Sequence, residues 1–342
     1  MPPKFATYFT FSEFNNGVKA THDQFREELS KFNCLLAVYV CGVMNSVTRD
    51  WQGHTRFDAV EQLVRNSFTP QAAERIVAEL GNPQRPRGLY HRQQLLFVAK
   101  EALLACPEIG GKDPLVPAHS GEMARVLLMA NDLLPKGLAG PSPTIDQMIN
   151  VMSEFIPIAE ASGFQKPMNK ILRSRLMIEH FFPDGNTEIR GIFERAIGVP
   201  LDEYFALCFA TLCRYVDLDF KKYQTDPGSY VLSAGWYRTT PVNATAIGNF
   251  LREISATVGE FKTALGGRNT AVSDFTCFRT KPCLKDDENY LLIDPVFLAE
   301  KSETGVFWSI NQALPARAST SVPPRLGHRI RAVRQLAAGR VS

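Results

Sequence analysis

The amino-acid sequence predicts a mainly α-helical protein with a small β-hairpin near residues 276–293 and a disordered or weakly helical C-terminal tail. Apolar residues recur at spacings of three and four along much of the chain, and cap-forming residues stand at several ends of these runs. From about Phe275 two short apolar runs flank a charged turn. We therefore expect strands to form less than about one-tenth of residues 1–270, against about 20–25% in an average globular protein.

Capping residues and apolar periodicity predict the helices of the first half of the chain. Thr69 can cap a helix that begins at Pro70, and Gly81 follows its last apolar residue, Leu80. The apolar pattern predicts further helices in this half at about 22–45, 89–105 and 120–134. Pro, Gly and Arg dominate the connecting loops at 81–88, 110–117 and 135–143.

The second half opens at Thr144, which fits a capping box with Gln147. Further helices are expected at 167–181, 187–197, 201–216, 242–253 and 255–265. In the first of these we expect a solvent face and an opposite apolar side; the solvent face comprises Lys170, Arg173 and Arg175, and the apolar side Ile171, Leu172, Leu176 and Ile178.

The hairpin is expected to pair Thr276–Leu284 with Tyr290–Ile293 across the turn Lys285–Asn289. Asp294 and Pro295 predict the start of a short helix at Val296–Lys301, and residues 305–310 predict another strand or helix start.

The C-terminal tail differs in composition from the rest of the chain. After Glu303 it holds six arginines, no lysine and no acidic residue, so the preceding part carries the remaining 32 of 38 Lys+Arg against all 35 Asp+Glu. Such an Arg/Ala/Pro/Ser-rich stretch is typical of a GC-rich gene read out of frame. We expect a protein truncated before its effector domain, with a tail that does not pack stably.

The apolar periodicity, the loop at 135–143 and the change of composition in the tail together divide the chain into consecutive regions. They are an N-terminal helical subdomain at 1–134, a second helical subdomain at 144–270, a hairpin and short-helix connector at 271–310, and the abnormal tail at 311–342.

Composition narrows the class of protein. Of 342 residues 45% are apolar and 21% charged, which is typical of a globular protein with a sizeable core. The first residues lack the features of a signal peptide, and the longest nearly continuous apolar run, Cys34–Met44, is too short for a bilayer about 30 Å thick. We expect a cytoplasmic protein without a membrane partner.

The number and spacing of the cysteines indicate a protein of a reducing compartment. There are seven, scattered and without a Cys-x-x-Cys pair. We expect Cys34, Cys41, Cys208 and Cys213 to be buried free thiols.

Motifs for nucleotide, zinc-protease, hydrolase or calcium chemistry are missing from the sequence. The six histidines are dispersed, so no metal, cofactor or catalytic residue is assigned. An enzyme site assembled from dispersed residues, namely His119, Glu122, Glu179 and His180, stays open as an alternative.

One basic segment offers a candidate nucleic-acid site. Its side chains could hold phosphates and stack on bases; they are Arg85, Arg87, Tyr90 and Arg92. A solvated loop that leads into a helix explains the same residues more simply. The arginines of the C-terminal tail are the other group that could bind nucleic acid.

Residues 241–310 resemble a segment of known architecture. The resemblance depends on Ile247–Leu251, Phe278–Leu284, Tyr290–Asp294, Phe297–Lys301 and Gly305–Trp308. This stretch is similar to the segment before a C-terminal nuclease-like domain of the PD-(D/E)xK type in large bacterial proteins, some of which look like defence or mobile-element components. The resemblance implies that any nuclease core lies beyond this stretch, because no strand-borne acid-x-Lys pair occurs here.

These observations favour a non-catalytic helical interaction or regulatory module of a larger bacterial protein. Its partner stays unidentified, with another protein or nucleic acid as the open classes.

Overall fold

The computed structural model describes residues 7–48, 56–80, 82, 87–134, 167–181, 187–215, 226–266, 272 and 274–313. Helices form 71% of these residues and the strands are few and short, which confirms the predicted mainly α-helical class with a small sheet. The predicted capping box at Thr144, the loop at 135–143 and the tail beyond Ala313 lie outside the described residues.

Contacts divide the chain into two compact units. The first contains the described parts of Met1–Phe164 and Thr257–Cys277, and the second those of Gln165–Asp217, Asp226–Ala256 and Phe278–Ser342. This grouping differs from the consecutive regions that composition suggested. Residues 257–277 belong to the first unit because their helix packs against a helix more than a hundred residues earlier in the chain.

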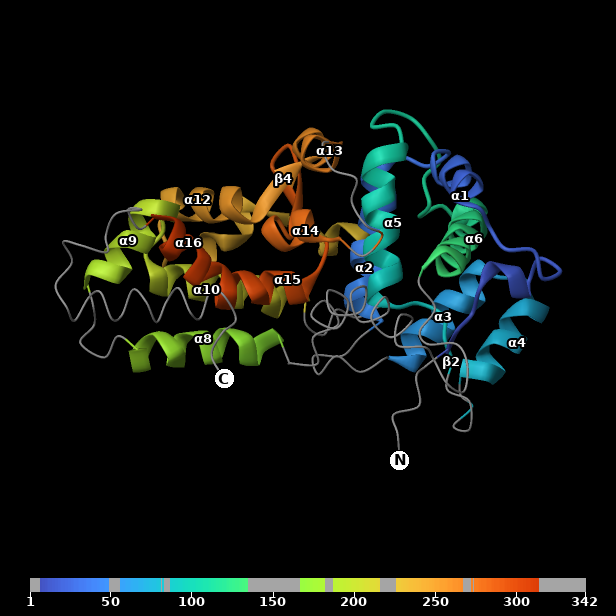
Figure 1. Ribbon diagram of the computed structural model, residues 1–342, viewed down its shortest axis with the longest axis horizontal. Coiled ribbons are helices and arrows are strands. Elements are labelled where there is room, and N and C mark those ends of the chain that lie inside the picture. The colour runs from blue at the N-terminus through green and yellow to red at the C-terminus, as the bar shows by residue number, and fades with distance from the viewer. Residues whose placement is uncertain are drawn as a thin grey trace, which may run out of the picture. The chain divides into compact units, whose positions relative to one another are not determined.

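The first unit is built mainly from helices. Its elements are β1 (Thr7–Tyr8), η1 (Phe11–Glu13), α1 (His22–Leu29), α2 (Cys34–Val47), α3 (Phe57–Ser67), α4 (Pro70–Leu80), β2 (Arg87–Gly88), α5 (Arg92–Ala105), α6 (Pro117–Leu133) and α13 (Val258–Gly266). Helices α2 and α5 lie side by side and form its core (Figure 1). Both are buried around most of their circumference, as expected of central helices. β1 and β2 form a short parallel pair.

The predicted helix at 22–45 is two helices. α1 ends at Leu29, and Asn33 starts α2 by accepting a hydrogen bond from the Leu36 N–H at 3.1 Å. Between them the backbone of Lys31 and Asn33 bonds to Lys112 in the α5–α6 loop. The apolar period runs across this break, so periodicity alone did not reveal it.

The second unit combines helices with the small sheet. Its elements are α8 (Pro167–Phe181), α9 (Thr187–Ile197), α10 (Leu201–Tyr215), η2 (Pro227–Tyr230), β3 (Leu232–Ser233), η3 (Ala234–Thr239), α12 (Ala244–Ile254), β5 (Cys283–Asp286), β6 (Asn289–Leu292), α15 (Pro295–Glu300), η4 (Lys301–Gly305) and α16 (Val306–Ala313). β4 (Ser255–Thr257) and α14 (Thr276–Thr280) contain points where the chain passes from one unit to the other. The sheet has the order β3-β6-β5-β4.

The predicted hairpin forms, but over a shorter range. β5 and β6 are antiparallel, with Asp286 opposite Asn289, and Asp287 occupies the turn with φ of 50°. Residues 276–280 form α14 rather than a strand. The segment before Cys283 therefore belongs to a helix, although its composition suited a strand.

A π-helical turn joins α15 to α16. η4 is formed by Lys301–Gly305, and its first three residues are buried. π-Helical turns are rare and appear mostly as single turns inside α-helices. α15 and η4 both pack against α8, and Figure 1 shows α8 running beside α15.

Within the described part of the chain, no single helix is long and apolar enough to cross a membrane. Helices α9 and α10 together have sufficient length and apolar composition, but the chain bends by 59° between them.

Candidate functional site

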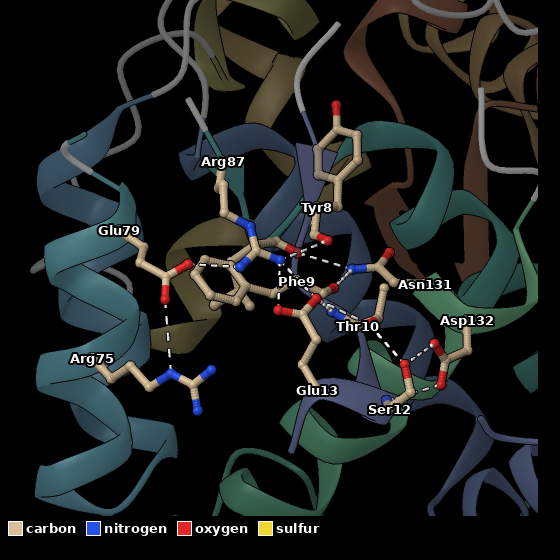
Figure 2. A network of polar contacts seen from close by, with 11 residues as sticks. Tyr8, Phe9, Thr10, Ser12, Glu13, Arg75, Glu79, Arg87, Asn131 and Asp132 are labelled. Atoms are coloured by element: carbon tan, nitrogen blue, oxygen red, sulfur yellow. Dashed lines mark hydrogen bonds and ion pairs between the residues drawn. The ribbon is translucent and has the colours of Figure 1, made fainter. Parts of the chain in front are cut away.

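Arg87 lies at the centre of a polar network in the first unit (Figure 2). Its Nη2 donates to both carboxylate oxygens of Glu13 at 2.6 and 2.7 Å, and its Nη1 donates to Glu79 at 2.6 Å. The guanidinium carbon lies 3.9 Å from the centre of the Phe9 ring. Two carboxylates and an aromatic face therefore engage this arginine, which ties β2 to α4 and to the N-terminal segment.

The end of α6 anchors the same N-terminal segment. Asn131 Nδ2 donates to the Phe9 carbonyl at 2.7 Å, and Asp132 accepts hydrogen bonds from the backbone of Ser12 and Ala20, each at 3.1 Å. Figure 2 shows these side chains converging on β1 and η1. The network fixes the backbone of the N-terminal segment, since a fully hydrogen-bonded polar cluster is rigid.

The structure corrects the proposed nucleic-acid site. Arg92 is 3% exposed and Tyr90 7% exposed, so neither can reach a phosphate or a base. Arg87 is engaged by Glu13 and Glu79. Arg85 lies outside the described residues. Sequence reasoning missed this because burial and carboxylate partners distant in sequence leave no local signal in a basic segment.

The Arg87 network predicts a pH dependence of stability. Burial alone would raise the pKa of Glu13, but hydrogen bonds and charge from Arg87, with hydrogen bonds from Thr10, hold this pKa below its ordinary value of 4.5. A lowered carboxyl pKa stabilises the folded state above the ordinary value, and that contribution is lost as the pH falls through the folded-state pKa.

We therefore expect Glu13→Gln to lower the denaturation midpoint at pH 7 and to differ less and less from wild type as the pH falls below about 4.5. Urea denaturation of both proteins across this range measures the effect. A midpoint difference that stays constant with pH would contradict the assigned role of the Glu13 charge.

The dispersed enzyme residues are engaged locally. In the first unit His119 Nδ1 lies 3.0 Å from the Asp113 carbonyl, and Glu122 forms an ion pair with Lys112. In the second unit Glu179 pairs with Arg175 at 3.0 Å. The side chain of His180 lies outside the described part of the structure.

Three of the four expected thiols are buried, as predicted. Burial raises the pKa of Cys34 to about 11 and that of Cys208 to about 12, which keeps both thiols protonated and unreactive at neutral pH. The prediction is wrong for Cys213, which is exposed. It lies five residues after the buried Cys208, about 140° around α10.

Among the described residues, no group of three or more His, Cys, Asp or Glu side chains is arranged to hold a metal ion.

Buried charge concentrates in the second unit, where α8 packs against α15 and η4. Lys170 Nζ donates to Glu300 at 3.0 Å, and the two side chains are only 8% and 9% exposed. Arg279 reaches the second oxygen of Glu300 at 3.1 Å. Buried Glu303 pairs with Arg173. The Lys170 and Arg173 pairs join α8 to α15 and η4, and the Arg279 pair joins α14 to α15.

The structure corrects the predicted faces of α8 at Lys170, Leu172 and Leu176 only, because Ile171 and Ile178 are buried and Arg173 and Arg175 exposed as predicted. Lys170, Ile171, Ser174 and Ile178 are buried, whereas Leu172 and Leu176 are 54% and 64% exposed. Both faces contain apolar residues, so the apolar pattern did not decide between them. Glu300 and Glu303, which are distant in sequence, supply partners for Lys170 and Arg173 on the packed side.

A tightly fixed loop between α5 and α6 presents the most exposed large apolar side chain of the described residues. Ile109, in the loop 106–116, is 94% exposed. Asn33 holds this loop through its Nδ2, which donates to the Glu108 carbonyl at 3.1 Å and the Gly110 carbonyl at 3.0 Å. The Cys34 N–H donates to the Pro107 carbonyl at 2.9 Å.

Two glycines complete the loop. Gly110 and Gly111 have φ of 80° and 83°, in the left-handed region that favours glycine. Charged side chains brace both sides, since Lys262 bonds to Glu108 at 2.7 Å and Lys112 pairs with Glu122. Ile109 is thus exposed on a loop whose backbone is held by hydrogen bonds and ion pairs.

Comparison of the chain with protein-family models, with curated proteins and with solved structures gives no match.

Proposed function

We propose that this chain is a non-catalytic helical interaction module that engages another protein through the loop carrying Ile109. The observation that carries the proposal is the combination of extreme exposure and fixed backbone at this one position. A protruding apolar side chain contributes to binding by entering a partner's pocket, and a fixed loop avoids the entropy cost of ordering it on association.

The surroundings of Ile109 fit this role. Glu108 and Lys112 flank it with one charge of each sign, and both charges are already paired within the unit. Apolar anchors ringed by polar groups are the usual anatomy of a protein interface. The resemblance of residues 241–310 would place such a module beside a nuclease-like effector of a bacterial protein, and we keep that context as part of the proposal.

Site-specific photo-crosslinking tests the proposal. We expect a photoreactive residue at position 109 to yield one discrete heteromeric adduct in cells, and one at the similarly apolar, exposed Val18 to yield none of that mass. Adding unlabelled wild-type chain as a competitor should lower the yield of the adduct, whereas adding Ile109→Asp chain should not. Competition by Val18→Asp should match wild type.

The side chain of Ile109 is in solvent, so we expect Ile109→Asp to melt at the wild-type temperature. A thermal melt separates lost binding from lost folding. Equal competition by the Ile109→Asp and Val18→Asp chains would show that Ile109 is not an anchor, and the proposal would have to be abandoned.

A further inference from the structure

The last turn of α10 carries an arginine that is not paired with a carboxylate. Arg214 is half-buried, and its Nη2 donates to the Ser229 carbonyl in η2 at 2.7 Å. Within the described part of the chain, no carboxylate forms an ion pair with it, and Asp226, at the start of the same turn as Ser229, is exposed. A guanidinium drawn partly out of water is stabilised most by an anion.

Two buried donors lie beside this charge. Arg214 Nε and Ser229 Oγ both lack a hydrogen-bond partner among the described residues, and Ser229 is only 6% exposed. Since Oγ belongs to the residue whose carbonyl accepts from Nη2, the two donors lie within a few ångströms of each other. A buried donor without an acceptor destabilises the folded state, so a pair of them at one place points to an acceptor from outside the chain.

The backbone around these donors is held by hydrogen bonds. Tyr215 Oη donates to the Tyr230 carbonyl at 2.8 Å, beside the bond from Arg214 to Ser229. Tyr230 Oη in turn donates to the Leu292 carbonyl of β6 at 3.0 Å. Two consecutive residues of α10 thus hold two consecutive carbonyls of η2, and η2 is tied to the sheet. Donors held in this way need little ordering when a ligand binds.

From these observations we infer that Arg214 and Ser229 form a binding site for a small oxyanion of the phosphate or carboxylate class. One oxygen of the ligand accepts from the Nε–H and another from the Oγ–H, and the negative charge compensates the guanidinium. Arginine suits such ligands because its planar donors match the geometry of their oxygens. The site lies in the second unit and does not depend on the Ile109 loop.

A buried water molecule is the main alternative. Water could bond to Nε and Oγ, but it would leave the charge of Arg214 uncompensated. The carbonyl end of α10 offsets part of this charge, as does Trp236, whose ring centre lies 5.9 Å from the guanidinium carbon. Neither of them supplies an acceptor to Nε or Oγ. An oxyanion supplies both the acceptors and the charge.

Thermal melts of the full chain with added inorganic phosphate test the site. Sodium chloride keeps the ionic strength constant, so the screening of surface charges is the same in all samples. We expect phosphate to raise the melting temperature of the wild-type chain in a saturable way. Arg195→Met is the matched control, because Arg195 is an exposed arginine near the end of α9 in the same unit, and this variant should keep the full rise.

Ser229→Ala is the decisive variant. Its hydroxyl has no partner among the described residues, so without phosphate the variant should melt at or slightly above the wild-type temperature. Loss of the Oγ donor should raise the phosphate concentration for half of the maximal effect about ten-fold. Arg214→Lys keeps the positive charge but lacks the Nε donor, so it should weaken phosphate at least as much.

Acetate in place of phosphate separates the two ligand classes. A rise that depends on Ser229 supports the site with either anion, and the anion with the larger rise identifies the class. Equal responses of wild type and Ser229→Ala to both anions would overturn the inference, as would a wild-type chain that responds to neither. A lower melting temperature of Ser229→Ala without ligand would show that water already satisfies the hydroxyl, and the site would be rejected.

Discussion

Glu300→Ala should destabilise the second unit by about 3–5 kcal/mol, because it leaves Lys170 buried without its carboxylate. The cost arises mainly from the uncompensated charge and not from the lost attraction. Arg279 also loses its contact with Glu300, but its side chain is partly exposed and can be hydrated. Urea denaturation measured by circular dichroism gives the free energy of unfolding.

Two matched variants test this explanation. Glu179→Ala removes an exposed ion pair on α8, the helix that carries Lys170, and its effect should stay within about 0.5 kcal/mol. Replacing the buried pair by Lys170→Met with Glu300→Leu should restore most of the stability, since apolar side chains carry no charge to desolvate. A loss below about 1 kcal/mol in Glu300→Ala would show that Lys170 reaches water in solution.

Gly111→Ala should be the most damaging change in the Ile109 loop, at about 2–5 kcal/mol. The left-handed backbone at φ of 83° costs an L-residue about 1–2 kcal/mol. A Cβ there would also lie 2.7 Å from the backbone nitrogen of Asn33, and backbone cannot move aside as a flexible side chain can. Overpacking of this kind costs about 1–3 kcal/mol more.

Gly110→Ala is the matched control. Its φ is similar, at 80°, but no atom lies within 4 Å of the added Cβ, so only the backbone cost of about 1–2 kcal/mol should appear. Thermal melts and the Ile109 photo-crosslink should be measured on both variants. If the two alanines have equal effects, the close approach of Gly111 to Asn33 does not hold in solution, and the fixed loop loses its main support.

The sequence by itself determined the helical class and the ends of several helices, although it did not predict α3. Pro70–Leu80, Pro167–Phe181 and Thr187–Ile197 begin and end where the sequence predicts. Caps, prolines and glycines act within one helical turn, so their effect can be read from neighbouring residues. The hairpin near 276–293 was found for the same local reason, although its first strand starts at Cys283.

Only the tertiary structure decided which side chains could meet a partner. Lys170 is buried because Glu300 comes from a helix 130 residues later, and Arg87 is engaged by Glu13, 74 residues earlier. The leucines of α8 face solvent as a consequence of the first pairing. Ile109 gave no signal in the sequence, because its exposure depends on a loop that Asn33 holds from another helix. Charge pairing and loop anchoring join distant segments, so local pattern predicted the helices but not the surfaces they present.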